Sequence, residues 1–257
     1  MSGLDSTVTI LGTYTWNILL EVDRKELVGI ASFSPSSEYL AVRKNDKVAI
    51  LSTSTWEMVN EVERESMVRI ISFSPNGEYL AVGGKDKKAA IFSTSNWRIV
   101  HEVERESIVN IITFSPNGEY LAVGDSKVAI LSTSNWEIVH EVERGEIMYC
   151  LCFSPSNLYL ALSGPDFKTT IFYTGTWKIV DEVECGILVC NIFFSPCGEY
   201  LTLSGLGDQV AIYSTRARKI MQEVETLCEV RTLSFSPNGE YLAVGGSDNK
   251  VVCLATA

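Results

Sequence analysis

Short apolar runs rich in β-branched residues alternate with polar turns along the whole chain. Between residues 67 and 105, the runs MVRIISF and EYLAVGG are separated by Ser-Pro-Asn-Gly, in which proline fixes φ and glycine accepts a left-handed conformation. The next runs, KAAIF and WRIVHEV, are separated by Ser-Thr-Ser-Asn. No interval shows the sustained periodicity of a helix, so the pattern predicts two successive β-hairpins.

This pattern of two hairpins recurs about every 40 residues. The sequence FSPNGEYLAV, or a variant of it, begins at Phe33, Phe73, Phe114, Phe153, Phe194 and Phe235. Four short strands in such a period are typical of one blade of a β-propeller. The chain is therefore predicted to be all-β, with six four-stranded antiparallel blades that stack face to face. The alternative is an incomplete ring of seven blades.

The hairpin FSPNGEYLAVGG and an aspartate just before each third strand resemble the WD-repeat family of β-propellers. These aspartates are Asp46, Asp86, Asp125, Asp166, Asp208 and Asp248. The resemblance implies one propeller domain over residues 1–257 that acts as a protein-interaction scaffold. The Trp-Asp pair that names the family and the Gly-His pair before the first strand are absent, so the chain resembles a divergent member. We expect the aspartates to be structural and to accept backbone N–H groups within their own turns.

The two ends of the chain do not fit the period evenly. Residues 8–22 have the pattern of a third and a fourth strand, whereas residues 229–254 supply a first, a second and a third. The strand at about 16–22 is therefore predicted to complete the C-terminal blade, at about 229–256, and to cover its open edge. Two third strands then compete for one place. We expect one to be displaced or to pair with another molecule, which gives a monomer or a strand-exchanged oligomer.

Tryptophan opens the fourth strand in five copies. The residues are Trp16, Trp56, Trp97, Trp136 and Trp177, and Arg218 takes this place in a sixth copy. Such side chains are predicted to pack across the second hairpin or against the next blade, and the alternative is an aromatic ring that binds a ligand.

The composition argues against a nucleic-acid-binding, membrane-spanning or secreted protein. A formal net charge of −11 argues against nucleic acid as the main partner, since binding phosphates requires a basic surface. No apolar stretch is long enough for a membrane span, and the first residues do not resemble a secretion signal. The seven cysteines follow no disulfide or metal-ligand spacing, which favours free thiols and a cytoplasmic protein.

Candidate catalytic chemistry is missing from the sequence. There is no Ser-His-Asp or Cys-His set, no phosphate-binding motif and no cofactor signature, and the two histidines, His101 and His140, occupy the same position of two copies. We therefore expect a protein that is not an enzyme. The alternative is a small-molecule site or an active site at the central channel that the propeller resemblance implies.

Binding residues are sought where the copies differ. The second residue of each first strand lies near one mouth of the channel in this fold. It is Gly29, Arg69, Asn110, Tyr149, Cys190 or Arg231. Arginine and tyrosine are favoured at binding hot spots, so Arg69, Asn110, Tyr149 and Arg231 are hypothesised to bind a partner protein. The alternative is variation without function at exposed positions.

The links into the first strands carry a repeated acidic residue. These residues are Asp23, Glu63, Glu104, Glu143, Glu184 and Glu225, and arginine follows in four copies, at Arg24, Arg64, Arg105 and Arg144. In the last two copies Cys185 and Thr226 replace the arginine. The more negative side of this rim favours a basic peptide segment of a partner, and the alternative is screened surface charge.

Overall fold

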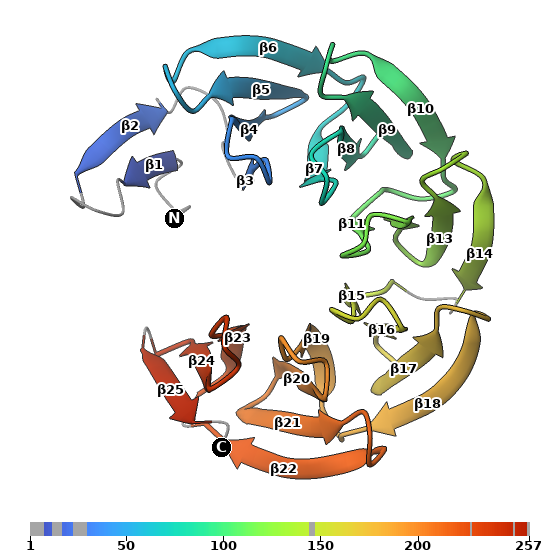
Figure 1. Ribbon diagram of the computed structural model, residues 1–257. Coiled ribbons are helices and arrows are strands. Elements are labelled where there is room, and N and C mark those ends of the chain that lie inside the picture. Colours follow the sequence, from blue (N-terminus) through green and yellow to red (C-terminus); the bar gives the residue numbers. More distant parts are fainter. Residues whose placement is uncertain are drawn as a thin grey trace. The chain divides into compact units, whose positions relative to one another are not determined.

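A computed structural model describes residues 8–11, 17–22, 30–143, 147–226, 228–248 and 250–255. In this part of the chain the strands form five four-stranded sheets, one three-stranded sheet and one two-stranded sheet, all antiparallel (Figure 1). The described residues contain no helix that is long and apolar enough to cross a membrane. The structure confirms the predicted all-β class and the propeller-type blades, six of which have three or four strands.

The chain divides into two compact units, and each is described by itself. The first unit comprises residues 1–114 and 118–139, and the second comprises residues 115–117 and 140–257. The boundary falls within the strand β14 (Ile138–Glu143).

The first unit contains three blades and a two-stranded sheet. The blades consist of β3 (Ala31–Phe33), β4 (Tyr39–Lys44), β5 (Lys47–Ser52) and β6 (Met58–Glu63); of β7 (Val68–Phe73), β8 (Tyr79–Gly84), β9 (Lys88–Ser93) and β10 (Ile99–Glu104); and of β11 (Ile111–Phe114), β12 (Tyr120–Gly124), β13 (Lys127–Ser132) and β14. The remaining sheet pairs β1 (Val8–Leu11) with β2 (Ile18–Val22).

The second unit contains three further blades. They consist of β15 (Cys150–Phe153), β16 (Tyr159–Ser163), β17 (Lys168–Tyr173) and β18 (Lys178–Glu184); of β19 (Leu188–Phe194), β20 (Tyr200–Leu206), β21 (Gln209–Ser214) and β22 (Lys219–Glu225); and of β23 (Val230–Phe235), β24 (Tyr241–Gly246) and β25 (Val251–Ala255). In each blade, strands that follow one another in sequence lie side by side.

The repeated Ser-Pro-Asn-Gly sequence forms the first hairpin turn of a blade. In the second blade, the Ser74 hydroxyl accepts a hydrogen bond from Tyr79 N at 2.9 Å, and the Ser74 carbonyl accepts one from Gly77 N at 2.9 Å. Gly77 has a φ of 75°, a conformation that costs little for glycine. The same turn recurs in the other blades, where Gly118, Gly198 and Gly239 have a φ of 75° and Ser37 and Asn157 a φ of 60°.

The core lies between neighbouring sheets of the same unit. One buried cluster of the first unit joins Val48 and Ile50 of one blade to Val68, Leu80 and Ala90 of the next. The two middle strands of such a blade are buried along most of their length, as expected for sheets covered on both faces. Full burial of each Leu or Ile side chain contributes about 1.5–3 kcal/mol, so stacking of blades provides most of the stability.

Both predicted third strands at the chain ends are paired within the chain. Strand β1 pairs with β2, and Ile10 is buried against Leu40, Val42 and Leu51. Strand β25 pairs with β24. The expected competition of these two strands for one place stays a prediction. The pairing of residues 16–22 with the C-terminal blade stays a prediction.

The close approach of β8 to the start of β7 predicts that Gly84→Ala is destabilising. A Cβ atom on Gly84 would lie 2.3 Å from the Met67 carbonyl oxygen, so the backbone of two strands must move. We expect a loss of about 1–3 kcal/mol in the free energy of unfolding, measured by urea titration. Gly207→Ala is the control, because its nearest atom, Ile187 Cγ2, is 3.7 Å away. Equal midpoints for the two variants would contradict this packing.

Candidate functional site

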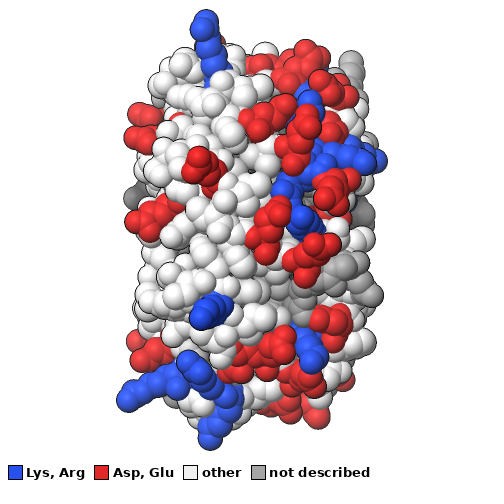
Figure 2. All heavy atoms as spheres, turned by 90° about the vertical axis from the view of Figure 1, so that its right-hand side faces the viewer, with Lys and Arg blue, Asp and Glu red and all other residues white. Residues whose placement is uncertain are grey.

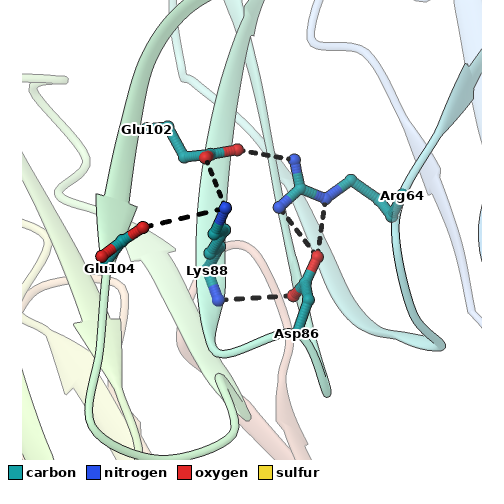
Figure 3. A network of polar contacts seen from close by, with 5 residues as sticks. All are labelled: Arg64, Asp86, Lys88, Glu102 and Glu104. Carbon is teal, nitrogen blue, oxygen red and sulfur yellow. Dashed lines mark hydrogen bonds and ion pairs between the residues drawn. The ribbon is translucent and has the colours of Figure 1, made fainter.

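A buried ion pair joins the link before β7 to the turn before β9. Arg64 donates to Asp86 Oδ2 from Nε at 3.1 Å and from Nη2 at 2.9 Å (Figure 3). Only 5% of the Arg64 side chain and 3% of the Asp86 side chain are exposed. Charges this deeply buried are stable only when they are paired, so the two residues depend on each other.

The same arginine also reaches the outer strand of the blade. Arg64 Nη1 lies 3.0 Å from Glu102 Oε2, and Lys88 Nζ lies 3.4 Å from Glu102 Oε1. Lys88 Nζ is also 3.7 Å from Glu104 Oε1, and Lys88 N donates to Asp86 Oδ1 at 3.3 Å (Figure 3). These contacts fasten the link, the turn and β10 together, and we call the five residues the Arg64 network.

The network revises the interpretation of the acidic links. Arg64 follows Glu63 in the sequence and was expected to take part in a rim of exposed charges, but its guanidinium is buried between strands of one unit. The next arginine in register, Arg105, is partly buried and donates from Nη2 to the Lys127 carbonyl at 3.3 Å. Arg24 and Arg144 lie outside the described residues. These link arginines therefore act in the fold at the positions where they are seen.

Turn aspartates accept backbone N–H groups two residues ahead. Besides Asp86, Asp166 accepts from Lys168 N at 3.4 Å and Asp248 accepts from Lys250 N at 3.1 Å. The Asp46 and Asp208 carbonyl oxygens accept N–H groups from the following links, at 2.9 Å and 2.5 Å. Asp125 differs, because its carboxylate accepts a side-chain amide described below. The carboxylates of Asp86, Asp166 and Asp248 thus bond within their own turns, and that of Asp86 also forms an ion pair.

The pKa of the Glu102 carboxyl reflects the network. Burial raises this pKa, but the hydrogen bonds and charges of Arg64 and Lys88 outweigh the effect and hold the pKa below its ordinary value of 4.5. Ionised Glu102 is therefore stabilised in the folded protein.

The tryptophans pack between blades. Trp97 meets Tyr39 of the preceding blade edge-on, with ring centroids 5.2 Å apart, and Trp136 meets Tyr79 in the same way at 5.1 Å. His101 stacks on Trp136 with an interplanar angle of 12°. In the second unit His140 stacks on Trp177, and burial lowers the pKa of His140. These contacts are those of structural side chains; Trp16 lies outside the described residues.

Two of the predicted binding residues lie together in the first unit. Arg69 is exposed, and its Nε donates to Asn110 Oδ1 at 3.2 Å. Asn110 Nδ2 in turn donates to Asp125 Oδ1 at 3.1 Å, and Asp125 is buried. A carboxylate only accepts hydrogen bonds when ionised, so Asp125 fixes the amide with its oxygen toward Arg69. The chain Asp125–Asn110–Arg69 holds an exposed guanidinium in place.

A second arginine, which was not predicted from the sequence, lies next to these hydrogen-bonded residues. Arg43, near the end of β4, donates from Nη1 to the Val68 carbonyl at 3.2 Å. Burial lowers the pKa of Arg43, and the positive charge of nearby Arg69 lowers it further. Its Nε is buried and has no hydrogen-bond partner among the described residues. We call Arg43, Arg69, Asn110 and Asp125 the Arg43–Arg69 cluster.

The remaining predicted residues belong to the second unit. Tyr149 is 43% exposed and Arg231 is exposed, and neither side chain forms a hydrogen bond or an ion pair with any residue the structure describes. Cys190 is half-buried, with Sγ 3.6 Å from the Leu188 carbonyl oxygen. Gly29 lies outside the described residues. Tyr149 and Arg231 thus have free polar groups on the surface of their own unit.

Surface charge is mixed where the strands are exposed. Figure 2 shows Asp and Glu side chains gathered in a band with Lys and Arg among them, beside surface that carries few charges. Lys47, for example, lies 3.1 Å from Glu61 and 3.3 Å from Glu63. Exposed pairs of this kind contribute little to stability, but they do neutralise each other.

Two of the cysteines are poor nucleophiles, and the cavity beside β25 is mainly apolar. Burial raises the pKa of the Cys150 thiol to about 12, and burial also raises the pKa of Cys152, so both thiols are protonated and poor nucleophiles at neutral pH. A cavity of about 260 Å³ lies beside β25, with Val224, Val244 and Leu254 in its mainly apolar wall. Throughout the described ranges, no group of three or more His, Cys, Asp or Glu could hold a metal ion.

Comparison with known proteins identifies repeat sequence in both units. Residues 31–115 match the family described as "Anaphase-promoting complex subunit 4 WD40 domain", and residues 222–253 match "WD domain, G-beta repeat". No curated protein matches the chain. Both family matches confirm the resemblance predicted from the hairpin sequence.

The Arg64 network predicts a large effect of removing one buried charge. Arg64→Ala leaves Asp86 buried and unpaired, so we expect a loss of about 3–5 kcal/mol in the free energy of unfolding, measured by urea titration. Replacing both partners, as Arg64→Met with Asp86→Asn, removes the stranded charge, keeps an acceptor for Lys88 N and should recover part of this loss. Lys47→Ala, at an exposed ion pair, is the control and should change little. An Arg64→Ala variant as stable as this control would contradict the role of the pair.

Glu102 predicts a contribution to stability that depends on pH. Because the folded pKa lies below the ordinary value of 4.5, this stabilisation is present above 4.5 and is lost as the pH falls through the folded pKa. Glu102→Gln should therefore lose stability at neutral pH and show a smaller further decrease on acidification, measured by thermal unfolding over a pH series. Glu57→Gln, an exposed carboxyl without an ion pair in the described structure, should keep the wild-type profile. Identical profiles for wild type and Glu102→Gln would refute the assignment.

Proposed function

We propose that this chain, a member of the WD-repeat family, is a non-catalytic scaffold that binds another protein through an exposed face of its blades. WD-repeat domains generally act as protein-interaction scaffolds and are typically not enzymes. One of the two matched families is named for a subunit of a complex, which supports a role in assembly.

The observation that carries the proposal is the Asp125–Asn110–Arg69 chain. A buried carboxylate fixes an amide, and the amide fixes an exposed guanidinium whose remaining N–H groups are free to bind. A side chain held in this way loses less conformational entropy on binding than a free one, which is the main advantage of a preorganised hot spot. Arg69 and Asn110 are therefore the residues assigned to the partner-binding face of the first unit.

The second unit supplies a separate set of candidates. Tyr149 and Arg231 are exposed there, and Glu184 and Glu225 are exposed at the ends of β18 and β22. Lys168 Nζ lies 2.9 Å from Glu184, which indicates that a lysine can be held at such a link. A basic peptide segment of a partner suits these acidic links.

We also propose an intracellular, cytoplasmic setting and no nucleic-acid partner. Seven free thiols are typical of a reducing compartment, and a net charge of −11 disfavours phosphate backbones. A monomer and a strand-exchanged oligomer both remain compatible with the paired third strands at the chain ends.

Capture from a cell lysate tests the function. The immobilised full chain should retain specific proteins, identified by quantitative mass spectrometry, and Arg69→Ala with Asn110→Ala should reduce their recovery about tenfold or more, because hot-spot residues contribute about 2 kcal/mol or more each. Arg98→Ala removes one exposed cation of the same unit and is the control. Tyr149→Ala with Arg231→Ala tests the second unit in the same way. Retention of no specific protein by the wild-type chain would refute the scaffold proposal.

A further inference from the structure

We infer that Arg43 and Arg69 form a binding site for the side-chain carboxylates of an acidic peptide segment in the partner protein. The inference rests on the proposed function and adds the chemistry of the partner at one site. Arg43 differs from the residues at the same position of the other blades, and neither arginine forms an ion pair with a described residue.

Arg43 stands where the other blades have no room or no charge. In the register of the sheets, the equivalent residues are Gly83, Gly124, Ser163, Ser204 and Gly245. A Cβ atom on Gly83 would lie 2.5 Å from Val109 Cγ1, so even alanine does not fit there without a shift. The first blade accommodates an entire arginine at this position. Arg43 therefore differs from its equivalents both in charge and in the space that its side chain occupies.

The fold needs at most a small donor at this position, because three blades have glycine there. Arg43 Nη1 donates to the Val68 carbonyl, and in the second unit Ser163 Oγ donates to the equivalent carbonyl, that of Val189, at 2.8 Å. Serine therefore satisfies the carbonyl of the next blade without adding a charge. The guanidinium of Arg43 has more N–H groups than this hydrogen bond uses, and it also carries a positive charge. Its buried Nε has no partner in the described structure.

The two arginines lie close together, and the nearest carboxylate of the cluster, that of Asp125, is bonded to Asn110 and not to either arginine. Arg43 donates to the carbonyl of Val68, the residue before Arg69, whereas Arg64, in the same unit, is paired with Asp86 and Glu102. Burial lowers the pKa of Arg43, and the positive charge of Arg69 lowers it further. Among the described residues, neither Arg43 nor Arg69 forms an ion pair, although the chain has 32 acidic and 21 basic residues. A bound carboxylate would replace this repulsion with attraction.

Geometry favours a carboxylate as the ligand. Arg69 uses Nε for Asn110, which leaves both Nη groups free, and a planar guanidinium presents such groups as a fork that matches two carboxylate oxygens. The cluster is local, and the net charge of −11 disfavours a long polyanion such as nucleic acid. A short acidic segment offers carboxylates to this small cluster without bringing the many negative charges of a long polyanion.

Fluorescence anisotropy with defined probes tests the inference on the full chain. The probes are three labelled peptides of equal length, in which serine alternates with glutamate, glutamine or lysine. The glutamate peptide should bind most tightly, and Arg43→Ser and Arg69→Asn should each weaken its binding about tenfold, which is typical for loss of one charge-assisted contact. Both substitutions introduce residues that other blades carry at these positions, Ser163 and Asn110, so both variants should fold.

Arg98→Asn is the matched control, because it removes one exposed arginine of the same unit at a distance from the cluster. It should keep the wild-type affinity, and circular dichroism should show the same unfolding temperature for all variants. Equal binding of the glutamate and glutamine peptides, preference for the lysine peptide, or preference for a single-stranded oligonucleotide would each overturn the inference. So would unchanged glutamate binding in both variants. Such results would leave the scaffold proposal standing, because lysate capture tests that proposal separately.

Discussion

Burial of sheet faces against neighbouring sheets is the interaction on which the blades of each unit depend. A single blade has an apolar face on each side, and Leu80 and Ile91 become fully buried only because another blade covers them. This constraint explains why the strand sequences hardly change between copies. Because of the same constraint, the sequence varies mainly at the ends of strands, and the polar contacts of this protein are found there.

The blades have similar buried strands and differ from one another in the polar contacts at the ends of these strands. The Arg64 network fastens a link to its blade with buried charges, whereas Arg43 and Arg69 bring two like charges together. The first arrangement is closed, since every charge has an opposite charge beside it. The second is open, since the repulsion is not compensated within the described chain. A difference of this kind separates residues that maintain a fold from residues available to a partner.

Much of the fold could be predicted, because the copies encode it several times. Periodicity, turn prolines and glycines gave the strands, and position in the repeat brought Arg69 and Asn110 together, since equivalent residues of stacked blades are neighbours. Arg43 was not predicted, because binding residues were expected in the first strands only. Its signal was an arginine among glycines and serines at one position of the second strand. The burial of Arg64 could not be predicted, because it depends on how close Asp86 and Glu102 come in space.

The aromatic contacts between blades imply a rule for how such a protein can evolve by recombination. The residue four positions after the tryptophan of one blade meets a residue of the following blade. His101, after Trp97, stacks on Trp136, and Asp181, after Trp177, accepts a hydrogen bond from the Tyr213 hydroxyl. Arg218, which replaces tryptophan in that blade, lies beside the second pair. Two junctions share the same histidine–tryptophan stack, whereas the junction beside Arg218 has the Tyr213–Asp181 hydrogen bond instead. A blade moved from one kind of junction to the other would meet the wrong side chain, whereas gene segments cut in the middle of a blade would carry each matched pair together.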